Sequence, residues 1–238
     1  MTNHHFPQAI AIDGPAASGK TTVGKMLAVR LGYLFLDTGF MYRAVTLAAL
    51  ENNVPIDDES AVFNLLTQLD IDVIQGGGEK DGRLYTALLN GRDVTWDVRT
   101  AEVDKNVSQV AAYQSVRENL VKRQRAIAKR GRVVMVGRDI GTVVLPDAPL
   151  KLYIIASPDE RAKRRQQEKL DRGQTSDYDQ ILTDIIRRDE IDSSRRFSPL
   201  RPAEDAIVLD STGRPPEAII ENILALSHFQ QWAVNSEQ

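Results

Sequence analysis

Cysteine is absent from this 238-residue chain, and its absence excludes several classes of structure and chemistry. Without a thiol the protein forms no disulfide, no thiolate nucleophile and no cysteine-ligated zinc site. This composition is compatible with a reducing compartment. The amino terminus also has neither the basic start nor the long apolar core of a signal peptide. We therefore expect a cytoplasmic protein.

The sequence also has little excess of either charge and no long apolar run. Lys and Arg number 30 and Asp and Glu number 33, so the formal net charge is −3. This balance does not indicate a basic surface for nucleic acid or for an anionic membrane. No apolar stretch approaches the about 20 residues of a membrane-spanning helix. We expect small-molecule substrates, no nucleic-acid or membrane partner, and a monomer.

What the chain does contain is a glycine-rich loop in an informative context. Residues 14–21 read Gly-Pro-Ala-Ala-Ser-Gly-Lys-Thr and directly follow the apolar run Ala9–Ile12. A buried strand, this loop and a helix hold a nucleoside triphosphate, because the loop N–H groups and the helix dipole converge on its phosphates. An ordinary glycine turn is the alternative. The predicted ATP-phosphate-binding residues are Gly14, Pro15, Ala16, Ala17, Ser18, Gly19, Lys20, Thr21 and Thr22.

Individual residues of this loop have specific predicted roles. Gly14 and Gly19 allow backbone conformations and close approaches that a Cβ would obstruct. Lys20 brings a cation to the β- and γ-phosphates, and the Thr21 hydroxyl is the expected Mg²⁺ ligand, together with the substrate phosphates. The helix that begins near Gly19 has an apolar stripe, and Gly32 is its predicted C-terminal cap.

Short apolar runs recur along the chain, with helical patterns between them. Such runs suit strands that are covered on both faces. They predict an α/β fold of the three-layer P-loop NTPase kind, with a parallel five-stranded sheet. The five runs are Ala9–Ile12, Leu34–Leu36, Val133–Val136, Leu152–Ile155 and Ala206–Leu209. We expect a single domain whose core comprises residues 6–38, 131–156 and 179–232.

Two stretches interrupt this pattern. Between about residues 70 and 95, the Asn90-Gly91 pair between short apolar runs predicts a small antiparallel sheet. The second stretch begins with a predicted capping box, Ser157 to Glu160, with Pro158 at the first helical position. Three arginines follow on one helical face, and the polar run 166–174 has the composition of a mobile lid.

Polar residues follow two of the predicted strands at the end where an open α/β sheet binds its ligands. After the first, Asp37 either caps the next helix or holds a metal-bound water, and these two roles are compatible. Arg43 suits bidentate phosphate binding. After the second, Arg138 and Asp139 stand between two glycines and are too costly to bury unsatisfied. A structural ion pair is the alternative for these two residues.

A third polar group is less distinctive. Arg188, Asp192 and Arg195 are spaced i, i+4 and i+7 on one predicted helix and therefore share a face. Taken alone, this spacing favours a solvated salt-bridge ladder. Arg117 is equally unremarkable alone, because its predicted helix is rich in basic residues.

Taken together, these segments resemble the bacterial cytidylate kinases over nearly the whole chain. The glycine loop marks only a superfamily, whereas the block Gly137-Arg138-Asp139-Ile140-Gly141-Thr142-Val143-Val144 and the arginine-rich segment 192–200 are much more specific. The resemblance implies Mg²⁺-dependent transfer of a phosphoryl group from ATP to CMP or dCMP. It also implies an acceptor-binding region with a β insert, about residues 39–115, and a helical lid, about residues 157–176.

The resemblance further implies roles for individual residues. The implied acceptor-binding residues are Thr38, Tyr42, Arg43, Ser108, Arg117, Gly137, Arg138, Asp139, Arg188, Asp192 and Arg195. Thr38, Arg117 and Asp139 would meet the cytosine, Arg188 and Asp192 the ribose, and Arg43, Arg138 and Arg195 the acceptor phosphate. The implied catalytic residues are Lys20, Arg138, Arg161 and Arg165, and Asp37 would contact the metal through water.

Two positions depart from the family pattern, namely Phe40, where a small residue is common, and Val136, where an acidic residue often stands. A kinase for another small acceptor such as UMP or dTMP is therefore an alternative reading. A GTP-hydrolysing switch is an alternative from another class, although the chain has no Asn-Lys-x-Asp element for guanine.

Overall fold

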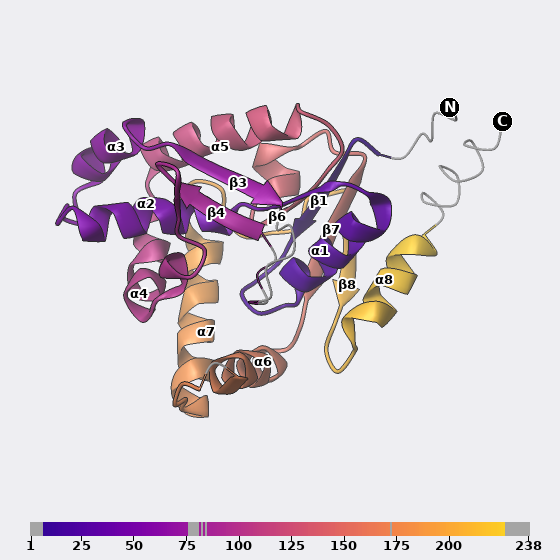
Figure 1. Cartoon of the computed structure of the whole chain (residues 1–238). Coiled ribbons are helices and arrows are strands. Elements are labelled where there is room, and N and C mark those ends of the chain that lie inside the picture. Colours follow the sequence, from indigo (N-terminus) through magenta and orange to yellow (C-terminus); the bar gives the residue numbers. More distant parts are fainter. Residues whose placement is uncertain (1–6, 76–80, 82, 84, 172, 227–238) are drawn as a thin grey trace. The chain divides into compact units, whose positions relative to one another are not determined.

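The computed structural model describes residues 7–75, 81, 83, 85–171 and 173–226 (Figure 1). The predictions for residue 6, for residues 76–80, 82 and 84 of the insert, for residue 172 of the lid and for residues 227–232 of the core lie outside the described residues. The described chain divides into two compact units: Leu34–Arg130 form one, and the described residues on either side of that segment form the other.

The scaffold is a five-stranded sheet with the strand order β2-β6-β1-β7-β8. β1 is parallel to both β6 and β7, and β8 is parallel to β7. The strands are β1 (Ala9–Asp13), β2 (Leu34–Asp37), β6 (Val133–Gly137), β7 (Leu150–Ile155) and β8 (Ile207–Asp210). Apolar side chains of β1 and β6 are fully buried, as expected of central strands with both faces covered. The predicted fold class and all five predicted strands are confirmed.

The first helix closes the strand–loop–helix unit that the glycine motif predicts. α1 (Lys20–Leu31) begins directly after Gly19 and packs against α8 (Pro216–Leu224) (Figure 1). Gly32 has φ 67° and ends the helix, with the N–H of Tyr33 donating to the carbonyl of Ala28 at 2.8 Å. The predicted glycine cap is therefore confirmed.

The segment predicted as the lid, about residues 157–176, contains α6 (Pro158–Asp171). This helix packs against α7 (Tyr178–Ser194), which lies beyond the predicted lid, through Ala162, Ile181 and Ile185 (Figure 1). The polar run that begins at residue 166 continues α6 as far as Asp171, with Glu168 and Lys169 half-buried and Asp171 exposed.

Only half of the predicted capping box forms at the start of α6. The Ser157 hydroxyl accepts the N–H of Glu160 at 3.2 Å, as predicted. The Ser157 N–H, however, donates to Thr212 Oγ1, and the Glu160 carboxylate accepts Arg164 Nε at 2.9 Å. The reciprocal bond of the box is therefore a wrong prediction, because Thr212 from a distant segment takes the Ser157 N–H and Arg164, one turn along α6, takes the Glu160 carboxylate.

The unit Leu34–Arg130 combines helices with a three-stranded sheet of order β3-β4-β5. Its helices are α2 (Gly39–Glu51), α3 (Glu59–Thr67), the 3₁₀ turn η1 (Asp97–Arg99), α4 (Ala101–Val110) and α5 (Gln114–Ala128). Its strands β3 (Ile71–Gln75), β4 (Tyr85–Leu89) and β5 (Arg92–Asp93) pair antiparallel. Asn90 and Gly91 have φ values of 51° and 77°, which confirms the predicted hairpin turn.

The two positions that depart from the family pattern are both buried. Phe40 packs on the Tyr85 ring with 5.6 Å between centroids, and Val136 lies inside β6, paired with Ile12.

After β6 the chain forms a π-helical turn, η2 (Ile140–Val144), which no sequence pattern predicted. None of the helices in the described ranges is long and apolar enough to cross a membrane.

Candidate active site

The glycine loop has the backbone geometry of an anion cradle. Gly14, Ala17 and Gly19 have positive φ values of 151°, 57° and 85°, and such conformations are typical of loops whose successive N–H groups bind anions. An added Cβ on Gly14 would lie 2.1 Å from the carbonyl oxygen of Ile154. The predicted need for glycine at position 14 therefore has a specific cause, which is the close approach of β7.

Two polar side chains are buried within this loop. Lys20, at the start of α1, is 6% exposed, and its Nζ donates to the Pro15 carbonyl at 2.9 Å. Ser18 is fully buried, and its hydroxyl has no hydrogen-bond partner in the described part of the chain. Thr21 stands in the first turn of α1, next to Lys20, and is half-buried. A cation and two hydroxyls thus surround a loop shaped to receive phosphate.

Asp13, the last residue of β1, connects the glycine loop to the chain that follows β6. Its two carboxylate oxygens accept the N–H groups of Ile140 and Gly141, each at 2.8 Å. Burial raises the pKa of Asp13 to about 6, against the lowering effect of these two N–H groups and of Lys20. The carboxylate holds the N-terminal end of η2 and therefore the loop that carries Arg138 and Asp139.

Arg138, Asp192 and Arg195 form a buried charge cluster. Arg138 Nε donates to Asp192 Oδ2 at 2.9 Å, and Arg195 Nη2 lies 3.3 Å from Asp192 Oδ1. Burial would raise the pKa of Asp192, but the charges of Arg138, Arg195 and Arg188 outweigh it and hold the pKa below its ordinary value. The expectation of a solvated ladder is therefore wrong for this group, since the Asp192 and Arg195 side chains are only 6% and 5% exposed. Arg195 also lies one residue beyond the end of α7, and not on it.

The three arginines of α6 are all engaged by protein groups. Arg161 is buried: its Nε donates to Ala156 O at 3.0 Å, its Nη1 to Ala16 O at 3.3 Å, and its Nη2 pairs with Asp189 at 2.6 Å. Arg164 pairs with Glu160 and donates to Ser211 O at 2.6 Å, whereas Arg165 pairs with Glu168 on its own helix. Arg161 therefore brings its charge to the glycine loop through the Ala16 carbonyl.

The unit Leu34–Arg130 holds a second group of predicted acceptor-binding residues. Arg43 Nη1 donates to the carbonyl of Val98 at 3.0 Å, and its Nη2 pairs with Asp104 at 2.6 Å. The guanidinium of Arg117 lies 5.2 Å from the centre of the Tyr42 ring, while its Nη1 donates to Ala111 O at 2.8 Å. The side chains of Arg43, Tyr42 and Arg117 are thus fixed by α4, η1 and one another.

Four further predicted site residues lie at the ends of strands, at the start of a helix or within one. Asp37 Oδ1 accepts the N–H of Gly39, the first residue of α2, at 3.0 Å, while the N-cap position itself is Thr38, whose side chain makes no capping hydrogen bond. Thr38 is buried at the start of α2, and Ser108 is half-buried on α4. Gly137 ends β6 directly opposite Asp13.

Several partners of the predicted residues were not identified from the sequence. Asp13 received no role, although a charged residue at the carboxyl end of a buried strand is a signal that could have found it. Asp104 and Asp189 hold Arg43 and Arg161, but they are distant in sequence and no local pattern connects them.

A parallel sheet whose first strand leads through a left-handed glycine loop into a helix, with Lys20 at the loop's end, defines the P-loop NTPase class of folds. An uncharacterized protein from Eubacterium ventriosum ATCC 27560 shares the fold with a TM-score of 0.52, at 14% identity, covering 95% of this chain and 99% of that one. Within the class, the cytidylate kinase family model matches residues 10–229, and the chain belongs to the cytidylate kinase family.

Curated relatives agree with this assignment over most of their length. The chain is 52% identical to the cytidylate kinase of Roseiflexus castenholzii (strain DSM 13941 / HLO8) over 219 residues, covering 92% of this chain and 93% of that protein. It is 47% identical to the cytidylate kinase of Bacillus subtilis (strain 168) over 216 residues, covering 91% and 94%.

Proposed function

We propose that this protein transfers the γ-phosphate of ATP to CMP or dCMP in a Mg²⁺-dependent reaction, giving CDP or dCDP. The observation that carries the proposal is the pairing of Asp13 with Gly137 across β1 and β6. The glycine loop leaves β1 directly after Asp13, and Arg138 follows Gly137. A cradle for a triphosphate and a buried arginine cluster therefore begin at paired positions, as a phosphoryl donor and an anionic acceptor require.

The donor is held by residues 14–22. The loop N–H groups and the N-terminus of α1 attract the β-phosphate, and Lys20 exchanges its contact with the Pro15 carbonyl for the β- and γ-phosphates. Arg161 and Arg165 add positive charge as charge develops on the transferred group. Phosphoryl transfer needs mainly positioning and charge neutralisation, so these cations carry most of the protein's contribution.

The hydroxyl oxygen of Thr21, beside the glycine loop, is a suitable ligand for a magnesium ion. Mg²⁺ keeps several waters and is usually bound through one or two protein oxygens together with substrate phosphates. Thr21, in the first turn of α1, supplies such an oxygen, and Asp37 would contact the ion through water. When bound, Mg²⁺ neutralises charge on the β- and γ-phosphates.

The acceptor is recognised by the arginines and by polar groups around them. Arg43, Arg138 and Arg195 bind its phosphate, Arg188 and Asp192 the ribose, and Thr38, Arg117 and Asp139 the cytosine. Tyr42, Ser108 and Gly137 complete this set. An oxygen of the acceptor phosphate attacks the γ-phosphorus in line with the departing ADP. This oxygen is largely ionised near neutral pH, so no strong general base is needed.

Nucleoside diphosphate formation from Mg·ATP, with CMP, dCMP, UMP, AMP and dTMP supplied separately, tests the proposal. Strong turnover of CMP and dCMP, weak turnover of UMP and none of AMP is the expected pattern. A preference for UMP or dTMP would contradict CMP and dCMP as the acceptors but would leave the proposed ATP site unchanged. The monomeric state, the cytoplasmic location and the absence of nucleic-acid or membrane partners remain predictions.

A further inference from the structure

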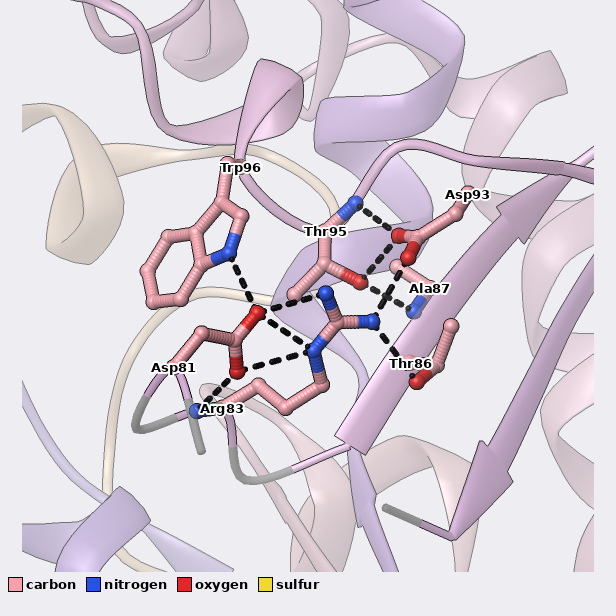
Figure 2. A network of polar contacts seen from close by, with 7 residues as sticks. All are labelled: Asp81, Arg83, Thr86, Ala87, Asp93, Thr95 and Trp96. Carbon is pink, nitrogen blue, oxygen red and sulfur yellow. Dashed lines mark hydrogen bonds and ion pairs between the residues drawn. The ribbon is translucent and has the colours of Figure 1, made fainter. Parts of the chain in front are cut away.

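Figure 2 shows a network of polar contacts centred on Arg83, which joins Asp81, the β4–β5 hairpin and Trp96. The Arg83 side chain is only 12% exposed, and its guanidinium bridges two carboxylates. Nε and Nη2 bind Asp81 at 2.6–3.0 Å, and Nη1 donates to Asp93 Oδ2 at 2.6 Å and to Thr86 Oγ1 at 3.1 Å. Arg83 thereby ties residue 81 to the β4–β5 hairpin.

The network continues from Asp93 to the start of η1. Asp93 Oδ1 accepts both the N–H and the hydroxyl of Thr95, at 3.0 and 2.6 Å. Thr95 is buried, and its oxygen accepts the N–H of Ala87 at 3.0 Å. Trp96, the residue that precedes η1, donates from Nε1 to Asp81 Oδ2 at 3.0 Å (Figure 2). Both residues before η1 are thus anchored to carboxylates that Arg83 holds.

η1 in turn fixes Arg43. The carbonyl of Val98, at the middle of η1, accepts Arg43 Nη1 at 3.0 Å, while Asp104 in α4 accepts Nη2 at 2.6 Å. Val98 belongs to η1 and is buried. A displacement of η1 therefore displaces this carbonyl as well. The orientation of the Arg43 guanidinium therefore depends on Asp81, Arg83 and Asp93 through the residues that precede η1, and all of these are distant from Arg43 in the sequence.

We propose that Arg83 is a positioning residue for the acceptor phosphate, acting through Asp93, Thr95 and η1 on Arg43. The inference rests on the proposed function, since it gives Arg43 the acceptor phosphate as its ligand. A small displacement of a group that positions a substrate can cost about a hundredfold in rate. The loss should fall on CMP and not on ATP, because the hydrogen bonds of the network among the described residues join residues of the unit Leu34–Arg130, to which the glycine loop does not belong.

The test compares Arg83→Met with a matched variant, Arg92→Met. Arg92 lies on the same hairpin and makes its own ion pair, with Glu51 at 2.6 Å, but its side chain is 52% exposed. Within the described part of the chain it meets η1 only through the charge of Asp97 and not through a hydrogen bond. We expect Arg83→Met to raise the KM for CMP about tenfold, with the KM for ATP within twofold. Arg92→Met should leave both constants unchanged. Trp96→Phe removes a single bond of the network and should cause a smaller shift in the same direction if Arg83→Met does not fold.

A double-mutant cycle separates positioning from general loss of structure. If Arg83 acts through Arg43, then Arg83→Met should change the KM for CMP by less than twofold in an Arg43→Met background. Independent, multiplicative effects of the two substitutions would overturn the positioning role, as would an unchanged KM for CMP in a folded Arg83→Met protein. Absence of CDP with the wild-type enzyme contradicts the proposed function itself, so the two failures are distinct.

Discussion

Arg138 and Asp192 are 54 residues apart in sequence, yet Nε of the first donates to Oδ2 of the second at 2.9 Å. Arg195 shares the same carboxylate, so one buried anion holds two arginines at the end of the parallel sheet. A lone acidic residue between two cations orients both and leaves the group with net positive charge. Such a cluster suits the binding of an additional anion.

Removal of this carboxylate should destabilise the fold. Asp192→Ala leaves Arg138 and Arg195 without their buried counter-charge, and loss of one partner of a buried pair costs about 3–5 kcal/mol. We expect a fall of that size in the free energy of unfolding, measured by urea denaturation. Asp184→Ala on the same helix is the control, because its ion pair with Arg187 is exposed, and it should change stability by less than about 0.5 kcal/mol. Equal effects of the two substitutions would contradict the buried cluster.

Asp13 predicts a specific dependence of stability on pH. Burial raises its pKa from 3.8 to about 6, so the folded protein binds this proton more tightly than the unfolded chain. The raised pKa contributes roughly 3 kcal/mol to the free energy of unfolding. This contribution is fully present below about pH 4 and is lost as the pH rises to about 6. Relative to Asp13→Asn, the wild-type protein should lose about that much free energy of unfolding between about pH 4 and pH 7. A difference between the two proteins that stays constant over this range would show that Asp13 keeps an ordinary pKa.

Two glycines with matching φ values, Gly14 in the glycine loop and Gly131 outside it, separate the cost of backbone strain from the cost of a steric clash. Gly14 and Gly131 have nearly identical φ values of 151° and 150°, but only at Gly14 would a Cβ meet another atom, 2.1 Å from Ile154 O. Gly131→Ala should therefore cost the strain alone, about 1–3 kcal/mol. Gly14→Ala should cost more and abolish ATP binding, measured by calorimetry. Equal stability losses with ATP binding retained would refute the close approach as the reason for Gly14.

Lys20 is expected to act mainly in turnover. Lys20→Ala removes the cation that reaches the β- and γ-phosphates, and loss of such a cation typically costs about 10³-fold or more in kcat. Steady-state kinetics with Mg·ATP and CMP measure the effect. Arg30→Ala, at the other end of α1, removes only an exposed ion pair with Glu221 and should leave kcat unchanged. Activity of Lys20→Ala within a few-fold of wild type would exclude its role.

Local patterns predicted the elements whose causes are local. The glycine loop, the Gly32 cap, the Asn90-Gly91 turn and the five strands each follow from a few neighbouring residues, and the structure has all of them. Spacing alone was misleading for Asp192, because helical periodicity identifies a shared face but not whether that face is buried. The family resemblance was needed to single out this stripe.

Other features depend on contacts between distant segments and had no sequence signal. Asp13 accepts the first two N–H groups of the π-helical turn η2, which follow it in sequence by more than a hundred residues. The half-formed capping box at Ser157 shows the same effect in reverse, since Thr212 from a remote loop replaces the local partner. Both features involve hydrogen bonds between segments that are distant in the sequence.

The most direct test of the account is to follow ADP and CDP in one reaction by ³¹P NMR, with Mg·ATP present and CMP either added or omitted. We expect ADP and CDP to form in equal amounts when CMP is present, and almost no ADP to form without it. ADP production that is independent of CMP, with no CDP, would show a nucleotide hydrolase and would contradict the account.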